Sequence, residues 1–235
     1  MTEPRRLLKG MPHATTRRVR GRRFFLKPTE WVADLTRYCV ALSAGRHRAG
    51  VSLYAYSSQA NHTHANLRDL HQRGQLSQVP SFERDLHRNL ACALNARYGE
   101  AESVWAPGSY SNTEIHTSLS VERQLLYLWT QPVKDGLCER PEEWPGFALF
   151  PEDFGKIIFA RKPAGAYFGT RPWASCAGAP PAAPRSSLPQ IASFRVGVPP
   201  GYEGWPLGQV RSYFRFLLEL ELDRAAVFTI GFKSD

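Results

Sequence analysis

Hydrophobic and polar residues alternate, or recur at helical spacing, along most of the N-terminal half of the chain. In GVSLYAYSS (50–58), Val51, Leu53 and Ala55 alternate with their neighbours, which is typical of a strand with one buried face. The stretch QANHTHANL (59–67) follows almost at once and fits the next strand. The pattern therefore predicts strands at 13–19, 50–58 and 59–67, and two short strands within 102–116.

Apolar residues spaced three and four apart predict four helices. The first starts after Pro28-Thr29-Glu30, and the second ends at Tyr98-Gly99, where glycine suits a helix terminus. Ser120 is expected to cap the third helix and Pro132 to end it. We expect these helices at about 30–47, 80–98, 120–133 and 207–222.

Strands and helices in this order predict an α+β fold of ferredoxin-like type. Its sheet would be mostly antiparallel, with the helices packed on one face. An Ala/Pro/Ser-rich stretch, ASCAGAPPAAPRSSLP, is typical of a linker. The expected organisation is a basic tail (1–10), a main domain (11–150), an extension of its core (151–173), the linker (174–189) and a C-terminal helical tail (190–235).

Charge is concentrated near the N-terminus. The net charge of the 235 residues is +9, and residues 1–30 hold nine Lys or Arg and two Glu, which accounts for most of it. A local basic segment favours a polyanionic partner such as nucleic acid, because neutralised phosphates release counterions. The alternative is a solvated tail that binds nothing.

The remaining composition narrows the class of protein. No apolar run approaches the roughly 20 residues that span a bilayer, so no membrane association is expected. The basic N-terminus lacks the apolar segment of a secretory signal. The cysteines show no CxxC spacing, which argues against a disulfide framework and favours a reducing, cytoplasmic setting. They are Cys39, Cys92, Cys138 and Cys176.

The candidate chemistry begins with His62 and His64. Residues i and i+2 of a strand point to the same face, so the two imidazoles would lie side by side and could bind one divalent ion. Taken alone this signal is weak, and the spacing by itself favours two polar residues on a sheet surface.

A second pair lies on the third helix. Tyr127 and Gln131 are i and i+4, so their side chains share a face. Gln131 offers an amide oxygen to a cation, and Tyr127 offers a hydroxyl nucleophile. A phenol is a weak nucleophile at neutral pH and needs an electrophile that a metal has polarised. The alternative is that Tyr127 is an ordinary residue of an amphipathic helix.

Four blocks in order resemble the REP-associated tyrosine transposases of bacteria, a branch of the single-tyrosine HUH transposases. NHTH (61–64) resembles the strand with the histidine pair, and LLYLWTQPVKDGLCERPEEWP (125–145) resembles the block with the tyrosine. HATTR (13–17) resembles the opening strand, and LNARYGEAESVWAPGSY (94–110) the end of a helix and the segment after it. The similarity covers roughly residues 11–147.

This resemblance implies a DNA transposase acting on single-stranded DNA beside REP-like hairpins, as a monomer or homodimer in the bacterial cytoplasm, associated with the nucleoid. It implies a ferredoxin-like domain with the tyrosine on a helix across the sheet. Tyr127 would be the nucleophile of a 5′-phosphotyrosine intermediate. The metal, Mg²⁺ or Mn²⁺, would bind to His62, His64 and Gln131.

Basic and aromatic residues near these blocks are candidates for DNA contacts. Arginines could follow the backbone, and an aromatic ring could stack on an unpaired base. A solvated arginine and a core tryptophan are the alternatives. The candidates are Arg17, Arg18, Arg20, Arg22, Arg23, Trp105 and Tyr110.

The chain departs from the family around the second histidine. Thr63 replaces an apolar residue, and the polar run from Ala65 to Asp69 predicts that the strand ends early. These departures leave two further hypotheses open. One is a relative that binds single-stranded nucleic acid without turnover, and the other is an unrelated α+β protein.

Overall fold

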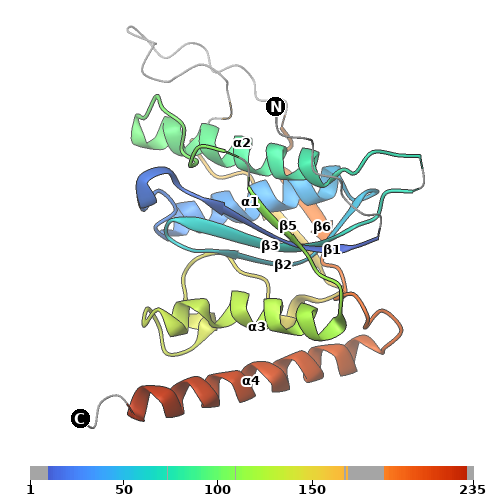
Figure 1. The fold of residues 1–235 in the computed structure, drawn as a ribbon. Coiled ribbons are helices and arrows are strands. Elements are labelled where there is room, and N and C mark those ends of the chain that lie inside the picture. The colour runs from blue at the N-terminus through green and yellow to red at the C-terminus, as the bar shows by residue number, and fades with distance from the viewer. Residues whose placement is uncertain (1–9, 73, 109, 167, 169–187, 232–235) are drawn as a thin grey trace, which may run out of the picture.

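A four-stranded antiparallel sheet forms the centre of the computed structural model, which describes residues 10–72, 74–108, 110–166, 168 and 188–231 (Figure 1). Its strand order is β2-β3-β1-β4, and two helices connect the strands in a βαββαβ sequence. This topology confirms the prediction of an α+β, ferredoxin-like fold. The strands are β1 (Pro12–Arg18), β2 (Val51–Ser58), β3 (His62–Asp69) and β4 (Ser111–Glu114), and the helices are α1 (Glu30–Arg46) and α2 (Val79–Tyr98).

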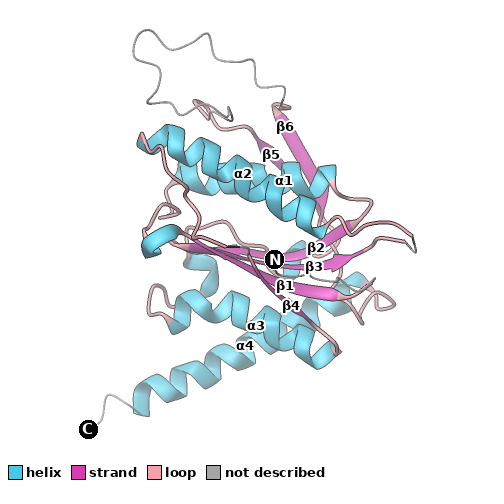
Figure 2. Cartoon of the chain, turned by 45° about the horizontal axis from the view of Figure 1, so that its top comes forward, coloured by secondary structure: helices cyan, strands magenta, loops and turns pink. Residues whose placement is uncertain are grey.

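Helices cover both faces of this sheet. α1 and α2 pack on one face, and α3 (Ser118–Lys134) lies across the other (Figures 1 and 2). The expectation that all helices share one face was therefore wrong. Both faces of β2 and β3 are largely buried. The sequences of these two strands therefore do not mark one face as covered by helices and the other as open.

Short-range chemistry sets the helix ends. The Thr29 hydroxyl accepts a hydrogen bond from the Val32 amide at 3.2 Å and caps α1, which begins where the sequence predicts a helix start. At the end of α2, Gly99 takes a left-handed conformation (φ +68°) that a glycine adopts without strain. α3 differs from prediction: Thr117, not Ser120, is its cap, with the Ser120 amide donating to the Thr117 hydroxyl at 3.1 Å.

Two further boundaries correct the sequence-based expectations. α3 continues through Pro132 to Lys134, because a proline restricts mainly the residues before it. β3 does not end early but runs to Asp69, paired on both sides with β1 and β2. Its polar residues alternate with Ala65 and Leu67, so each face of the strand keeps its own environment.

Beyond residue 150 the chain forms a second sheet that the sequence pattern does not predict. β5 (Ile157–Arg161) and β6 (Ile191–Arg195) form a second antiparallel sheet against α1. The approach is close, because a Cβ at Gly45 of α1 would collide with the carbonyl oxygen of Ser193. α1 is thus held between two sheets.

α4 (Leu207–Gly231) packs along α3 on the side away from the main sheet (Figure 1). Phe214 of α4 lies 6.2 Å, centroid to centroid, from Trp129 of α3, and both contact Phe154. Lys134 donates to Glu221 at 2.8 Å. α3 is therefore fixed between the sheet and α4.

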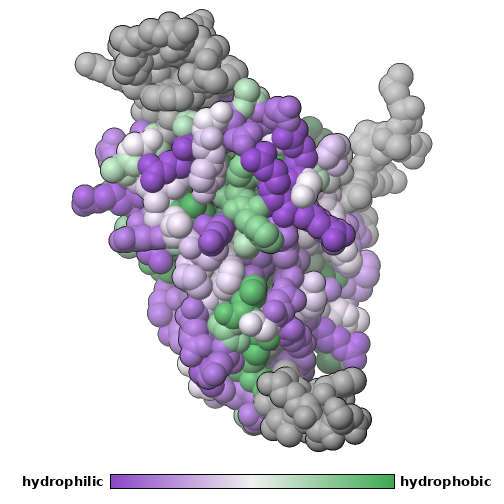
Figure 3. Space-filling view, turned by 90° about the vertical axis from the view of Figure 1, so that its left-hand side faces the viewer, coloured by the Kyte–Doolittle hydropathy of each residue, from purple (hydrophilic) through white to green (hydrophobic). Residues whose placement is uncertain are grey.

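The predicted basic tail and the Ala/Pro/Ser linker fall almost entirely on positions 1–9 and 169–187, outside the described residues. Within the described part of the chain, no helix has the length and apolarity needed to span a membrane. The face on the side of the loop between β1 and α1 is mainly hydrophilic, with small hydrophobic patches (Figure 3).

Candidate active site

A cleft of about 880 Å³ lies between the main sheet and α3. β1, β3 and β4 form its floor, α3 forms one wall, and the loop between β1 and α1 closes one end. His62, His64, Tyr127 and Gln131 all line it. Residues from two parts of the chain more than sixty positions apart are therefore brought to one place, as predicted.

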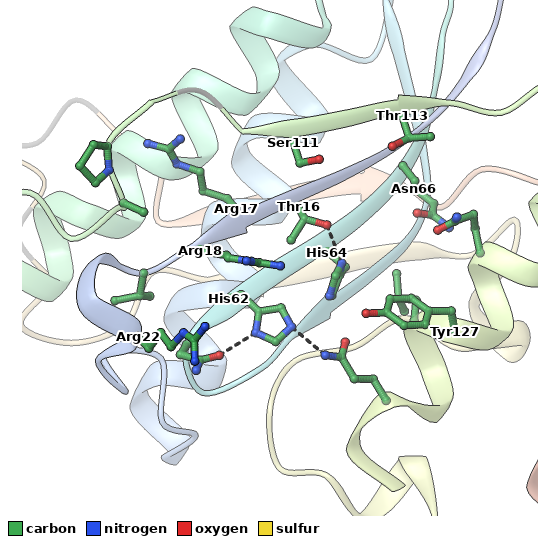
Figure 4. A pocket seen from close by; sticks show the side chains of 18 of the residues that line it. Thr16, Arg17, Arg18, Arg22, His62, His64, Asn66, Ser111, Thr113 and Tyr127 are labelled. Atoms are coloured by element: carbon green, nitrogen blue, oxygen red, sulfur yellow. Dashed lines mark hydrogen bonds between the residues drawn. The ribbon is translucent and has the colours of Figure 1, made fainter. Parts of the chain in front are cut away.

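The two histidines lie side by side on β3 with their rings at right angles and 4.7 Å apart. Each ring is held through its Nδ1 atom. His62 Nδ1 lies 2.7 Å from the Asn61 side-chain oxygen, and His64 Nδ1 lies 2.9 Å from the Thr16 hydroxyl (Figure 4). With Nδ1 engaged, each imidazole presents Nε2, the arrangement common for metal-ligating histidines.

α3 supplies the other two side chains. The Gln131 amide nitrogen lies 2.9 Å from His62 Nε2, and the Tyr127 ring lies 5.7 Å from the His64 ring (Figure 4). Tyr127 is 49% exposed, so its hydroxyl is open to a molecule in the cleft. This proximity argues against two isolated surface histidines.

The donor atoms fit a divalent cation. His64 Nε2 and the Gln131 side-chain oxygen are both buried and have no hydrogen-bond partner among the described residues. Turning the Gln131 amide by half a turn exchanges its oxygen and nitrogen. Two imidazoles with one amide oxygen suit a transition metal such as Mn²⁺. Among the described residues, no cluster of three His, Cys, Asp or Glu offers a competing site.

Burial also keeps the histidines in the form that binds metals. It lowers the pKa of His62, and it lowers the pKa of His64 to about 3, helped by the neighbouring His62. Both rings are consequently neutral at pH 7, with a free lone pair for a cation.

The arginines near the site fall into two groups. Arg17, Arg18 and Arg22 line the cleft, and their charges suit a phosphate backbone (Figure 4). Arg20 and Arg23 instead form ion pairs, with Glu102 and Glu100 respectively. Part of the predicted arginine set is thus engaged by acidic residues and does not line the cleft.

The aromatic candidates do not line the cleft either. Trp105 is 6% exposed, and its indole nitrogen donates to the His87 carbonyl at 2.8 Å. The prediction that Trp105 stacks on an unpaired base was therefore wrong, because this ring belongs to the core. Tyr110 is half-buried and precedes β4.

Thr63 faces away from the cleft, into a buried polar cluster under α2. Its hydroxyl lies 3.3 Å from His87 Nε2, and His87 Nδ1 lies 3.3 Å from the Glu83 carboxyl. Thr15 donates to Glu83 at 2.6 Å. The departure at Thr63 thus satisfies a polar group on the opposite face of β3 and leaves the histidine pair undisturbed.

We expect Glu83→Gln to change how stability depends on pH. Burial raises the pKa of Glu83 to about 7, above its ordinary value of 4.5, despite Thr15 and Arg17 nearby. Burial likewise lowers the pKa of the facing His87 to about 3. The stability that Glu83 contributes is full below about pH 4.5 and is lost as the pH rises through 7.

Glutamine keeps the shape and the acceptor but cannot ionise. The variant should therefore match the native protein at pH 4.5 and exceed it at pH 8 by up to roughly 3 kcal/mol. Urea unfolding at both pH values measures this difference. A constant difference between the two proteins at all pH values would contradict the raised pKa of Glu83.

Sequence reasoning missed several residues of the cleft. Thr16 and Asn61 orient the imidazoles, and Asn66 and Gln124 line the end beyond Tyr127. The spacing of Asn66 from His64 (i+2) and of Gln124 from Tyr127 (i−3) contains the signal for two of them. The position of Thr16 beside His64 depends on the pairing of β1 with β3, which the sequence of one strand alone does not reveal.

Comparison with solved structures agrees with this description of the fold. The chain is similar to a REP-associated tyrosine transposase bound to a REP hairpin, with 22% identity and a TM-score of 0.51 over 65% of this chain and 85% of that one. A protein assigned as a transposase from Deinococcus radiodurans matches with 16% identity and a TM-score of 0.36, over 57% of this chain and 97% of that one.

The first of these two matches shows the fold. The chain has the fold of a REP-associated tyrosine transposase, which confirms at that level the resemblance seen in the sequence. No family model matches the sequence, and no curated protein matches it.

Proposed function

We propose that the protein is a metal-dependent transposase that cleaves and rejoins single-stranded DNA through Tyr127. The observation that carries this proposal is the meeting of Tyr127, the histidine pair and Gln131 in one cleft that arginines also line. A candidate nucleophile, candidate ligands and charges that suit phosphates therefore lie together, which supports the proposal.

In the proposed reaction the Tyr127 oxygen forms a bond to phosphorus, and the bond from phosphorus to the 3′ oxygen breaks. The phenol loses its proton, and the departing 3′ oxygen gains one. The products are a 5′-phosphotyrosine and a free 3′-hydroxyl. The reverse attack by another 3′-hydroxyl joins strands without ATP, because the phosphotyrosine conserves the energy of the broken bond.

The protein's own residues position these groups. His62, His64 and Gln131 would hold the cation, which when bound polarises the phosphate and stabilises the charge that develops on it. The arginines of the cleft would neutralise the flanking phosphates. α4 holds α3 against the sheet, so Tyr127 approaches the phosphate from a fixed helix.

The solved relative is described as bound to a REP hairpin, and we propose a similar partner here. Incubation with single-stranded DNA hairpins and Mn²⁺ is expected to give a protein–DNA adduct that survives denaturing electrophoresis. Peptide mass spectrometry should locate the adduct on Tyr127. Hairpin binding with no adduct under any divalent metal would favour the binding module without turnover.

A further inference from the structure

One end of the cleft differs in chemistry from the rest. It lies beyond His64, away from the arginines, and three neutral polar side chains line it (Figure 4). Strand pairing places Asn66 of β3 opposite Ala14 of β1, which pairs in turn with Thr113 of β4. We call this the amide end of the cleft, formed by Asn66, Thr113 and Gln124.

Asn66 is the informative member. The residue is 2% exposed, and its amide nitrogen is buried without a hydrogen-bond partner among the described residues. A buried donor left unpaired destabilises a protein, and an apolar side chain of similar shape would avoid that cost. Because Asn66 follows His64 by two positions, its side chain faces the same cleft.

Gln124 lines the same cleft from α3, three residues before Tyr127. Within the described part of the chain, no hydrogen bond engages the side chains of Gln124 or Thr113. The amide end therefore offers unpaired donors and acceptors from three elements.

The charge along the cleft favours a neutral ligand group at this position. No Lys, Arg, Asp or Glu contributes to the amide end, whereas Arg17, Arg18 and Arg22 gather at the opposite one. Neutral amides with both a donor and an acceptor match the edge of a nucleobase. The best match is adenine, whose N6 donates and whose N7 accepts in a bidentate pair with Asn or Gln.

We propose that the amide end binds the base of a nucleotide beside the scissile phosphate and selects adenine there. This inference rests on the proposed function. The side chains of Asn66 and Gln124 read the base edge, and the arginines hold the backbone. In this proposal the protein itself determines which base lies beside the cleaved bond, in part through Asn66, two residues after His64.

The test uses a pool of DNA hairpins with four randomised nucleotides in the single strand on each side. Two fractions are sequenced: DNA bound with EDTA present, and DNA covalently attached with Mn²⁺ present. For the native protein, both are expected to show adenine enriched about tenfold at one position. Asn66→Leu and Gln124→Leu should remove this enrichment, and Gln72→Leu, an exposed amide in the loop before α2, should keep it.

A stability measurement separates base reading from a structural role. If Asn66 serves a ligand, Asn66→Leu should raise the melting temperature by a few degrees, since it removes an unpaired buried donor. An adenine analogue without the 6-amino group should weaken binding to the native protein and leave binding to Asn66→Leu unchanged. A lowered melting temperature with intact adenine preference would overturn the proposal.

The remaining outcomes are distinguishable. Attachment with a base preference that ignores Asn66 refutes the amide end and leaves the proposed function standing. Adenine-selective binding that depends on Asn66, without attachment, supports the amide end and refutes cleavage. Selection of another base through Asn66 overturns the assignment of adenine.

Discussion

Tyr127→Phe is expected to reduce covalent attachment of hairpin DNA to an undetectable level while the protein still folds and binds DNA. The change removes one oxygen atom, the atom that would bond to phosphorus, and keeps the ring that lies 5.7 Å from His64. The half-exposed position of Tyr127 means that no buried hydrogen bond is lost. Denaturing electrophoresis of labelled hairpins measures attachment, and fluorescence anisotropy measures binding.

Tyr98→Phe is the matched control, because Tyr98 is similarly exposed but stacks on Phe25 outside the cleft. It should attach DNA at the native rate. Attachment that persists in Tyr127→Phe would show that another residue is the nucleophile. Lost hairpin binding in the same variant would instead point to a role of the hydroxyl in recognition.

Local periodicity was enough to predict the main elements of this site. A strand repeats every two residues and a helix every 3.6, so the shared faces of His62 with His64 and of Tyr127 with Gln131 follow from spacing. The meeting of the two pairs does not follow from spacing. It depends on α3 crossing the face of the sheet opposite α1 and α2.

The expectation that β3 ends early was wrong because it rests on the polar composition of the segment and not on its alternating pattern. Ala65 and Leu67 alternate with Asn66 and Arg68, which is typical of a strand, yet the polar content suggested an early end. Polar residues of this strand lie on the floor of a cleft. A strand face in that position belongs neither to the apolar core nor to the fully exposed surface. Asn66 belongs to the segment that departs from the family's sequence pattern, and in the structure it lines the cleft.

The second sheet was missed for a different reason. β5 and β6 are five residues each and lie thirty residues apart in sequence, on either side of the Ala/Pro/Ser stretch. Their outward faces carry exposed apolar residues such as Phe159, so the hydrophobic pattern does not separate an inner face from an outer one. β5 pairs with β6, and both pack on α1. These contacts join residues far apart in the sequence, so no short stretch of the sequence reveals them.

The other large effect is expected from the histidine pair. His64→Ala removes an imidazole whose Nε2 is buried without a partner, and we expect it to abolish Mn²⁺-dependent attachment at every concentration of the metal. Thr16→Val tests the support of that ligand, because it deletes the 2.9 Å contact to His64 Nδ1 and keeps the imidazole. Loss of such a supporting group typically weakens metal affinity 10- to 100-fold.

The two variants should therefore respond differently when Mn²⁺ is raised. Thr16→Val should recover attachment at about 10 to 100 times the metal concentration, whereas His64→Ala should not recover. His116→Ala, which removes an exposed histidine outside the cleft, should match the native protein. Electron paramagnetic resonance of free Mn²⁺ measures affinity independently of cleavage. Equal affinity in all four proteins would place the metal elsewhere. Of the three substituted residues, His64 and Thr16 belong to the proposed site and His116 does not.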